Sequence, residues 1–317
     1  MNQLPERDLP PGSHRLLKEH LMTEIRRAEQ PARLGAKWLR PALAAAAVAT
    51  AAAVTFVVLP SSGSGSGPGS GSGASAQQPA KTAVAVVLED IALAAEDAGD
   101  SYGEIRDDQF VYIERKASYA RFETGKKTQI SPLRQSEMWT SVDGTRKGMI
   151  RQEGRQWATD PDGAPGEPGS ELSGTYRNLS KLPTDADKMY AWLKKMGPKN
   201  SGQETSQAMF VLVGDLIRNA LVPPEQGAAI FRAVARIPGV KVVENAVDAA
   251  GRRGVAITRD DPDNPTRDEW IFDVETHEYL GERTVATEDF SDIKQGQVIG
   301  NSAILDRAVV DRAGQRP

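Results

Sequence analysis

The sequence contains no cysteine and only three histidines among its 317 residues. Without cysteine the chain can form no disulfide, no thiolate zinc site and no cysteine nucleophile. It also lacks a Gly-rich phosphate-binding loop between a strand and a helix, and it has no nucleophile elbow. We therefore expect that the protein is not an enzyme and that it carries neither a cofactor nor a metal.

An excess of charge of one sign is missing as well. The 39 Lys and Arg residues nearly balance the 43 Asp and Glu residues, and the formal net charge is −4. Nucleic-acid-binding proteins usually carry a basic surface that neutralises phosphates. The charge balance therefore predicts no nucleic-acid partner.

One long uncharged run stands out, from Pro41 to Leu59, and it consists mostly of Ala and Val. As a helix it would be about 28 Å long, close to the thickness of the hydrocarbon core of a bilayer. Two threonines are its only polar residues, and these can hydrogen-bond within their own helix. We interpret the run as a single transmembrane helix that contacts membrane lipid. The alternatives are a buried core helix and a secretory signal, for which Ala74–Ala76 would offer a cleavage site.

The charges around this run predict its orientation. Basic residues crowd its N-terminal side, whereas no charged residue follows it before Lys81. Basic flanks resist translocation, so residues 1–40 should be cytoplasmic and residues 81–317 should be extracytoplasmic. The predicted location is the cell membrane. The basic residues are Arg26, Arg27, Arg33, Lys37 and Arg40.

The cytoplasmic tail (1–40) has the pattern of an amphipathic helix over residues 13–29. Ser13 is a suitable N-cap, and Pro31 ends the pattern. An apolar stripe recurs at helical spacing, formed by Leu17, Leu21, Ile25 and Ala28. An isolated helix of this length is marginal in water, so the stripe predicts a partner. That partner is either a cytoplasmic protein or the anionic inner surface of the membrane.

Residues 60–80 join the run to the rest of the chain and are rich in Ser and Gly. This composition is typical of a flexible coil with a reach of about 25 Å. We expect it to tether the outer domain without fixing its orientation.

The outer domain (81–317) is predicted to be α+β. Apolar residues at helical spacing predict a helix over 82–98, followed by strands over 109–117, 134–142, 145–153 and 156–159. Helices are predicted over 185–196, 203–220 and from Pro223-Pro224 onward, with Thr184 as a cap and Gly197 as a stop. The remaining strands are predicted over 240–247, 254–259, 269–272, 279–286 and part of 297–310.

Short connections between these strands predict an antiparallel sheet, with Asp143-Gly144 as a hairpin turn. We expect a curved sheet wrapped around helices, similar to the half-barrel of periplasmic lipoprotein-carrier and sigma-regulator sensor domains. Such a sensor would have an apolar concavity under its sheet with few titratable groups, whereas an enzyme would have a deep pocket with converging acids, bases or nucleophiles.

Several stretches together resemble an actinobacterial family of uncharacterised single-pass membrane proteins. They are LPPGSHRLLKEHLMTEIRR (9–27), LPTDADKMYAWL (182–193), ALVPPEQGAAIFRAVARIPGVKVV (220–243), AAGRRGVAI (249–257) and WIFDVETHEYLGERTVA (270–286). Genes of that family often accompany extracytoplasmic-function sigma factors. The resemblance thus implies an anti-sigma-like regulator whose helix over 13–29 binds a sigma factor, although the His and Cys signature of zinc-type anti-sigma proteins is missing. No catalytic or ligand residues follow from it.

Few residues of the outer domain suggest chemistry. His277 is its one histidine and lies in a stretch that reads as a turn, with Asp273 and Glu275 nearby. Residues 260–264 with Asp268 could offer oxygens to calcium, but the spacing does not fit a calcium-binding loop, so a solvated turn is favoured. The tryptophans at 139, 157, 192 and 270 could line a groove, but core packing is favoured. We favour an extracytoplasmic binding or sensing domain over a structural envelope role, and both over an enzyme.

Overall fold

The computed structural model describes residues 83–98, 102–123, 126–162, 172–201 and 203–317. The predicted tail (1–40) with its helix over 13–29, the predicted membrane span (41–59) and the Ser/Gly segment (60–80) lie outside the described residues. Within the described ranges, no helix is both long enough and apolar enough to cross a membrane.

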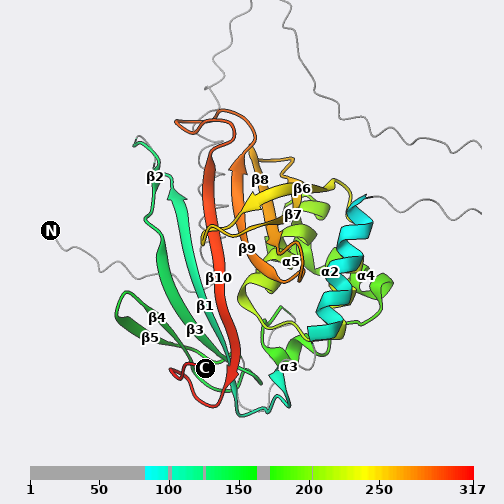
Figure 1. The fold of residues 1–317 in the computed structure, drawn as a ribbon, viewed down its shortest axis with the longest axis vertical. Coiled ribbons are helices and arrows are strands. Elements are labelled where there is room, and N and C mark those ends of the chain that lie inside the picture. Colours follow the sequence, from blue (N-terminus) through cyan, green and yellow to red (C-terminus); the bar gives the residue numbers. More distant parts are fainter. Residues whose placement is uncertain (1–82, 99–101, 124–125, 163–171, 202) are drawn as a thin grey trace, which may run out of the picture. The chain divides into compact units, whose positions relative to one another are not determined.

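These residues form an α+β domain in the predicted order: a helix, a group of strands, a block of helices and a second group of strands (Figure 1). The first part comprises α2 (Ala83–Asp97), β1 (Phe110–Arg121), β2 (Gln129–Ile130), β3 (Arg134–Ser141), β4 (Gly148–Gln152) and β5 (Arg155–Thr159). The helical block comprises α3 (Tyr176–Leu179), α4 (Ala186–Ser201), α5 (Thr205–Asn219) and α6 (Pro224–Val234). The last part comprises β6 (Val240–Val247), β7 (Arg253–Asp260), β8 (Thr266–Phe272), β9 (Tyr279–Ala286) and β10 (Val298–Val310).

The hairpin around Asp143-Gly144 is present, but its loop is longer than the two-residue turn predicted. β3 ends at Ser141 and β4 begins at Gly148. The Asp143 carboxylate accepts hydrogen bonds from the Thr145 amide at 3.0 Å and the Ser141 hydroxyl at 2.6 Å. Gly144 adopts a φ of 80°, which a residue with a side chain rarely does. The side chain of Asp143 thus holds the loop through hydrogen bonds, and the loop is longer than a two-residue turn.

The predicted limits of α4 were wrong at both ends. The Asp185 carboxylate, and not Thr184, accepts the amide of Lys188 at 2.9 Å, so the cap lies one residue later. The helix also continues past Gly197 and Pro198 to Ser201. A Cβ at position 197 would lie 2.8 Å from the backbone of Ala208 in α5. Gly197 therefore permits close contact between two helices and does not end one.

All of the neighbouring strands pair antiparallel, as predicted, in the order β5-β4-β3-β1-β10-β9-β8-β7-β6, with β2 attached to β1. The first and last long strands lie side by side, with Phe110 opposite Val310 and Tyr119 opposite Gly300. Their pairing joins the two strand groups into one curved sheet across the intervening helices (Figure 1).

The sheet coils strongly at its β6–β7 end. The tip of this hairpin crosses toward β10, where the Ala249 amide donates to the Ser302 carbonyl at 3.3 Å (Figure 1). Arg252 donates to the carbonyls of Leu280 and Ile304, at 2.8 and 2.7 Å. Arg252 is oriented by the buried Asp248 carboxylate, which its Nε reaches at 2.7 Å. One arginine therefore holds the hairpin tip over two other strands.

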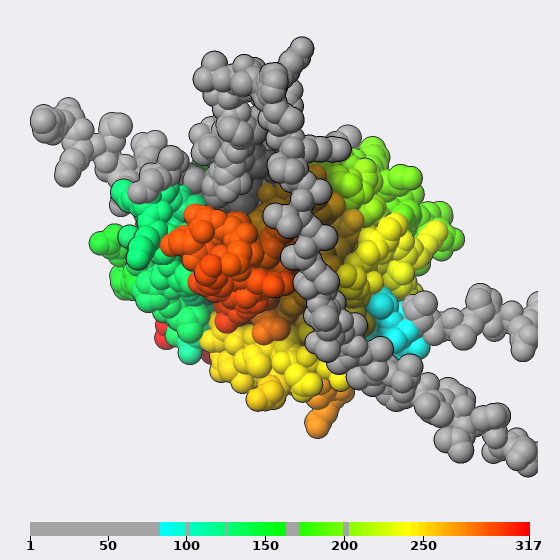
Figure 2. All heavy atoms as spheres, turned by 90° about the horizontal axis from the view of Figure 1, so that it is seen from above, coloured from blue at the N-terminus to red at the C-terminus, as the bar shows by residue number. Residues whose placement is uncertain are grey.

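The β1–β2 connection and the β9–β10 connection contact each other beyond one end of the long strands. Figure 2 shows the β9–β10 connection, coloured orange, beside the β1–β2 region, coloured green. The Thr128 amide donates to the Asp292 carboxylate at 2.9 Å, and the rings of Phe122 and Phe290 lie 6.1 Å apart. These contacts link two loops that are far apart in the sequence.

The main core lies between the helices and the face of the sheet that they cover, which we call the inner face. It combines side chains from α2, α4, α5 and α6 with Ile257 of β7 and with Trp270 and Phe272 of β8. Ile271, between the last two, belongs instead to a cluster on the outer face. This alternation follows from the two-residue period of a strand.

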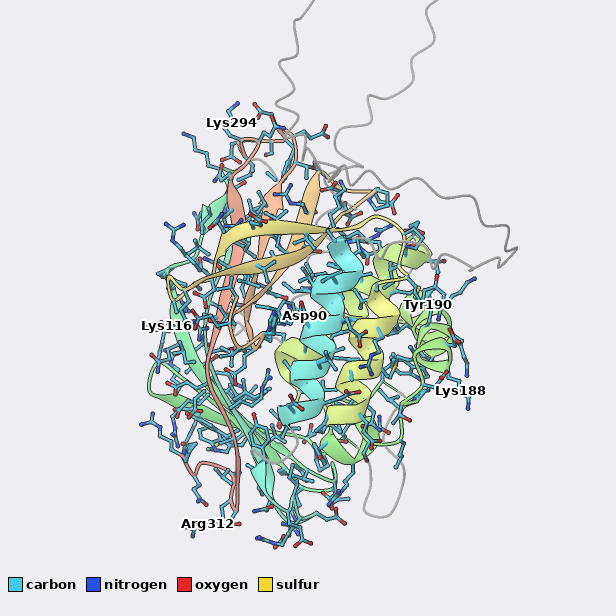
Figure 3. All side chains as sticks on the ribbon, turned by 45° about the vertical axis from the view of Figure 1, so that its right-hand side comes forward. Asp90, Lys116, Lys188, Tyr190, Lys294 and Arg312 are labelled. Carbon is cyan, nitrogen blue, oxygen red and sulfur yellow. The ribbon has the colours of Figure 1, made fainter. Side chains whose placement is uncertain are left out.

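Helix α2 packs along α6, and two ion pairs link the helices at their edge. Arg232 of α6 pairs with Glu89 at 2.9 Å and with Glu96 at 2.6 Å, both on α2. Asp90 lies on the opposite side of α2 and points to solvent (Figure 3). The surface-exposed ion pairs contribute little stability, so the apolar contacts of Leu88, Ile91 and Ala92 carry this packing.

Helix α5 is fixed by one aromatic pair. Phe210 stacks on Trp270 with ring centroids 3.7 Å apart and an interplanar angle of 9°. One turn further along α5, a Cβ at Gly214 would lie 2.7 Å from Trp270 Nε1. The indole therefore occupies the space that any side chain at position 214 would need.

We predict that Gly214→Ala lowers the free energy of unfolding by about 1–3 kcal/mol, because the added methyl overpacks the site. The matched control is Gly227→Ala in α6, where the new Cβ would lie 3.4 Å from its nearest neighbour. There the higher helix propensity of Ala should leave stability unchanged or raise it by up to about 1 kcal/mol. Urea unfolding of both variants measures the difference, and equal effects would contradict the packing argument.

Candidate functional site

The strongest concentration of buried charge in the described residues lies where the C-terminal end of α5 meets the inner face of the sheet. After Gly214, the polar residues Asp215, Arg218 and Asn219 join the apolar residues of α5. The sheet contributes charged side chains to the same place from three adjacent strands. They are Arg115 of β1, Glu282 of β9 and Arg307 of β10. We call this set, together with Tyr279 of β9, the inner polar layer.

Arg218 is the central cation of the layer. It pairs with Asp215 in its own helix at 2.5 Å and also with Glu282 across the gap to the sheet. The side chains of Arg218 and Glu282 are only 20% and 16% exposed. Burial of a pair removes solvation from both ions, so such a pair persists only where further hydrogen bonds complete it.

The other two arginines bind the end of the helix. Arg307 Nη2 donates to the Ile217 carbonyl at 2.8 Å, and Arg115 Nη1 donates to Asn219 Oδ1 at 2.8 Å. The last carbonyls of a helix lack partners within the helix and carry partial negative charge. Arg307 therefore satisfies an orphan carbonyl of α5 and is favoured there by the helix dipole.

Burial shifts the pKa values of four side chains in the inner polar layer. It raises the pKa of Glu282 above its usual value, although Arg218 opposes the shift. It also raises the pKa of Tyr279, with the negative charge of Glu282 as the next contribution. Burial lowers the pKa of Arg115 and of Arg307, but arginine starts so high that both remain cationic.

Two buried polar atoms of the layer have no hydrogen-bond partner among the described residues, Tyr279 Oη and Arg307 Nε. An unsatisfied buried donor costs about 1–3 kcal/mol. Each group acts on the pKa of the other, so they lie in one electrostatic neighbourhood. Both can donate to an oxygen acceptor, such as a carboxylate, a phosphate or a carbonyl group. The layer thus offers two unused donors, a tyrosine hydroxyl and an N–H of one of its three guanidinium groups.

The inner polar layer corrects one expectation from the sequence. A sensor of the expected type would have an apolar concavity with few titratable groups, but here the inner face carries buried ions. The signal was present in β1, because the alternation of Val111, Ile113 and Arg115 assigns an arginine to the face of two apolar residues. No sequence pattern predicted that the end of α5 would contact Arg115.

The predicted partner-binding stripe, formed by Leu17, Leu21, Ile25 and Ala28, lies outside the described residues. His277 does lie in a turn: its φ is 58°, and its amide donates to the Asp273 carbonyl. The Asp273 carboxylate accepts the amides of Glu275 and Thr276, both at 2.9 Å. Those two hydrogen bonds lower the pKa of Asp273. The carboxylate is therefore engaged by the turn itself and is not directed at His277 as part of a dyad.

The acidic stretch over 260–264 is also a turn. Asp261 Oδ1 accepts the amides of Asp263 and Asn264, at 2.8 and 3.2 Å. Asp268 accepts the hydroxyl of Thr284 at 2.8 Å. In the ranges that the structure describes, no group of three or more His, Cys, Asp or Glu residues is arranged to hold a metal ion.

The tryptophans pack in the core, as favoured from the sequence. Trp139 and Trp270 are almost completely buried, and Trp157 and Trp192 are partly buried against hydrophobic clusters. A small cleft of about 40 Å³ lies near the β3–β4 loop, between Gly144 and Thr175. Drug-sized ligands need about 300–1,000 Å³, so this cleft has room for water and not for such a ligand.

No family model and no curated protein matches the chain. Among solved structures, MucB in complex with MucA(peri) matches with 12% identity and a TM-score of 0.24, and MucB alone matches with 12% identity and a TM-score of 0.23. The matches cover 74% and 73% of this chain, which spans only 57% and 60% of the respective MucB chains. At these scores the matches say nothing about what this chain binds.

We predict that Tyr279→Phe leaves the free energy of unfolding unchanged or raises it by about 1 kcal/mol, since it removes an unsatisfied buried hydroxyl. The matched control is Tyr112→Phe. Its hydroxyl donates toward Glu137 at 3.0 Å and Glu114 at 3.2 Å, so this loss should cost about 1.5–3 kcal/mol. Denaturant unfolding compares the two. Equal losses would mean that Tyr279 Oη has a partner in solution.

Proposed function

We propose that the protein is a single-pass membrane regulator with a cytoplasmic tail (1–40), a membrane span (41–59) and an extracytoplasmic domain that binds a ligand. The observation that carries the proposal is the order of the chain. A basic tail and an uncharged apolar run precede a folded α+β domain, which begins at Ala83, just past the Ser/Gly segment. We propose binding and sensing, and not catalysis, as the role of that domain.

The inner polar layer supports a binding role for the outer domain. Tyr279 Oη and Arg307 Nε are donors without partners among the described residues, and Arg115 and Arg218 lie in the same layer. A ligand with an acceptor oxygen would satisfy these donors. It would also act on the end of α5, because Arg307 holds the Ile217 carbonyl.

The tail supports a regulatory role. Its apolar stripe needs a partner, and the resemblance to a family encoded beside extracytoplasmic-function sigma factors suggests a sigma factor for that position. The Ser/Gly composition of residues 60–80 argues against a rigid connection to the outer domain. Regulated proteolysis of the tether or association of the spans would be the route between the two sides.

The second candidate is an envelope-associated binding protein without a regulatory tail. The basic residues beside the stripe favour it, because they would hold the 13–29 helix on anionic lipid. The function would then lie wholly in the outer domain.

The absence of cysteine allows a direct test of the topology, since a single introduced cysteine is the sole thiol. We predict that Lys188→Cys, at an exposed position of α4, reacts with a membrane-impermeant maleimide in intact cells (Figure 3). Ser13→Cys in the tail should react only after the cells are lysed. Labelling of both or of neither in intact cells would contradict the proposed orientation, provided that both react in detergent.

The function of the stripe is tested by adding charge to it. We predict that Leu21→Glu in the full-length protein abolishes co-purification of a sigma factor from detergent-solubilised membranes, because a carboxylate would enter an apolar contact. The matched control is Thr23→Glu, which adds the same charge about 155° from the centre of the stripe at 3.6 residues per turn. This control should retain the sigma factor.

Failure of the wild-type protein to recover any sigma factor would contradict the anti-sigma proposal. If the tail then binds vesicles containing anionic lipid, the second candidate is supported. Equal loss with both variants would show a general effect of charge and would exclude the stripe as the contact surface.

A further inference from the structure

After β10 ends at Val310, the chain turns back over the outer face of the sheet, and the C-terminus lies beside β3, β4 and β10 (Figure 1). The Arg106 guanidinium anchors this turn to Asp311 at 2.8 Å. Arg312 in the same turn points to solvent at the lower end of the molecule (Figure 3). The residues that follow, 314–316, contact β3 and β4, and we call them the C-terminal segment.

The contacts of the C-terminal segment are specific. Trp139 Nε1 donates to the Gln315 carbonyl. Arg316 then places its guanidinium on Glu137, with Nε at 2.5 Å from Oε1 and Nη2 at 3.0 Å from Oε2. Gly314 lies against Met149, whose Cε would be 2.7 Å from a Cβ at that position. Three consecutive residues thus make a close contact, a main-chain hydrogen bond and a bidentate ion pair.

The surface beneath the segment is formed by side chains of β1, β3 and β4 that share the outer face. Tyr112 and Trp139 are opposite each other in register, and Glu137 is opposite Arg151. Trp139 is completely buried, and its ring lies 5.2 Å from that of Tyr112. Arg151 stacks over Trp139, with its guanidinium carbon 4.9 Å from the ring centroid. We call this surface the Glu137 site.

Glu137 is the specific element of the site. It is only 4% exposed, and it also accepts hydrogen bonds from Tyr112 at 3.0 Å and from Arg151 at 3.2 Å. The Arg316 guanidinium makes the largest contribution to holding the pKa of Glu137 below its usual value, against the opposing effect of burial. A planar guanidinium matches both carboxylate oxygens, which an ammonium group does not.

We propose that the Glu137 site is a docking site for an arginine-bearing turn of a partner protein, and that the C-terminal segment, which follows a turn closed by the hydrogen bond from the Gln315 amide to the Arg312 carbonyl, occupies it in this structure. The carbonyl before the arginine receives Trp139 Nε1, and the arginine binds Glu137. Departure of the C-terminal segment would remove the acceptor of Trp139 Nε1 and the bidentate partner of Glu137. The exposed site would therefore favour any segment that restores both contacts.

The geometry defines the partner. Its segment contains a turn, it places arginine directly after a free carbonyl, and it has glycine two positions before the arginine, because Gly314 adopts a φ of 86°. The covalently attached segment competes at a high effective concentration, on the order of millimolar. A partner therefore binds when the contacts of the C-terminal segment are weakened or the segment is removed. This inference concerns the outer face and is independent of the inner polar layer and of the tail.

The experiment uses the full-length protein in detergent, intact and with residues 314–317 deleted. A labelled peptide with the sequence of residues 311–317 (DRAGQRP) is the probe, and its anisotropy is measured. We expect the deletion variant to bind it at least 10-fold more tightly than the intact protein does. Substitution of the peptide residue that corresponds to Arg316 by Lys should weaken binding about 10-fold, and Glu137→Gln in the deletion variant should abolish it.

A second variant covers the case in which the deletion prevents folding. Arg316→Ala keeps the chain length and removes only the ion pair, and it should admit the peptide more readily than the intact protein does. Near-ultraviolet circular dichroism verifies the tertiary structure of each variant. Folded variants that bind the arginine and lysine forms of the peptide equally, or bind neither, would overturn the proposal. So would failure of both variants to fold, since the segment would then be a structural part of the core.

Discussion

The stacking of Phe210 on Trp270 is the contact on which the rest of the domain depends. It places α5 flat on β8, and Gly214 lets the helix backbone approach the indole without a side chain between them. With the helix held at that point, its last turn must project over β9, β10 and β1. Asp215, Arg218 and Asn219 are thereby brought to Glu282, Arg307 and Arg115. The inner polar layer is a consequence of this docking, because α5 is far from β1, β9 and β10 in the sequence and only packing brings them together.

The pairing of β1 with β10 forms the part of the sheet that faces the end of α5 in the inner polar layer. These strands are separated by the entire helical block, yet they run side by side from Phe110 opposite Val310 to Tyr119 opposite Gly300. Their inner faces carry Arg115 and Arg307, and the outer face of β1 carries Tyr112, which lies beside Trp139 of β3 beneath the C-terminal segment. Strand β1 thus contributes to the charged layer on one side and to the docking surface on the other. A residue slip in this register would exchange the two sets of side chains.

The two arginine sites differ in what they contribute. In the inner polar layer, buried arginines satisfy the end of a helix and leave two donor atoms unpaired among the described residues. In the Glu137 site, a largely exposed arginine binds a buried carboxylate, with 64% of the arginine side chain exposed and only 6% of the glutamate. An exposed arginine can leave into water at little cost, whereas the buried glutamate needs a replacement. At the Glu137 site we therefore expect one arginine to be exchanged for another. At the inner polar layer we expect a ligand to accept hydrogen bonds from donors that stay in place.

Local patterns in the sequence determined the elements of this protein. The bounds of β6 and β9 are those predicted, the helical block lies where the apolar spacing predicts it, and strands joined by short connections pair antiparallel. Tertiary structure decided the rest. Gly197 looked like a helix stop, but contact with α5 requires a glycine there, and the loop after Ser141 is set by the side chain of Asp143. Neither candidate site could be derived from the sequence, because each joins residues separated by about a hundred positions or more. Sequence periodicity shows which face of an element is apolar, whereas only packing determines which faces meet.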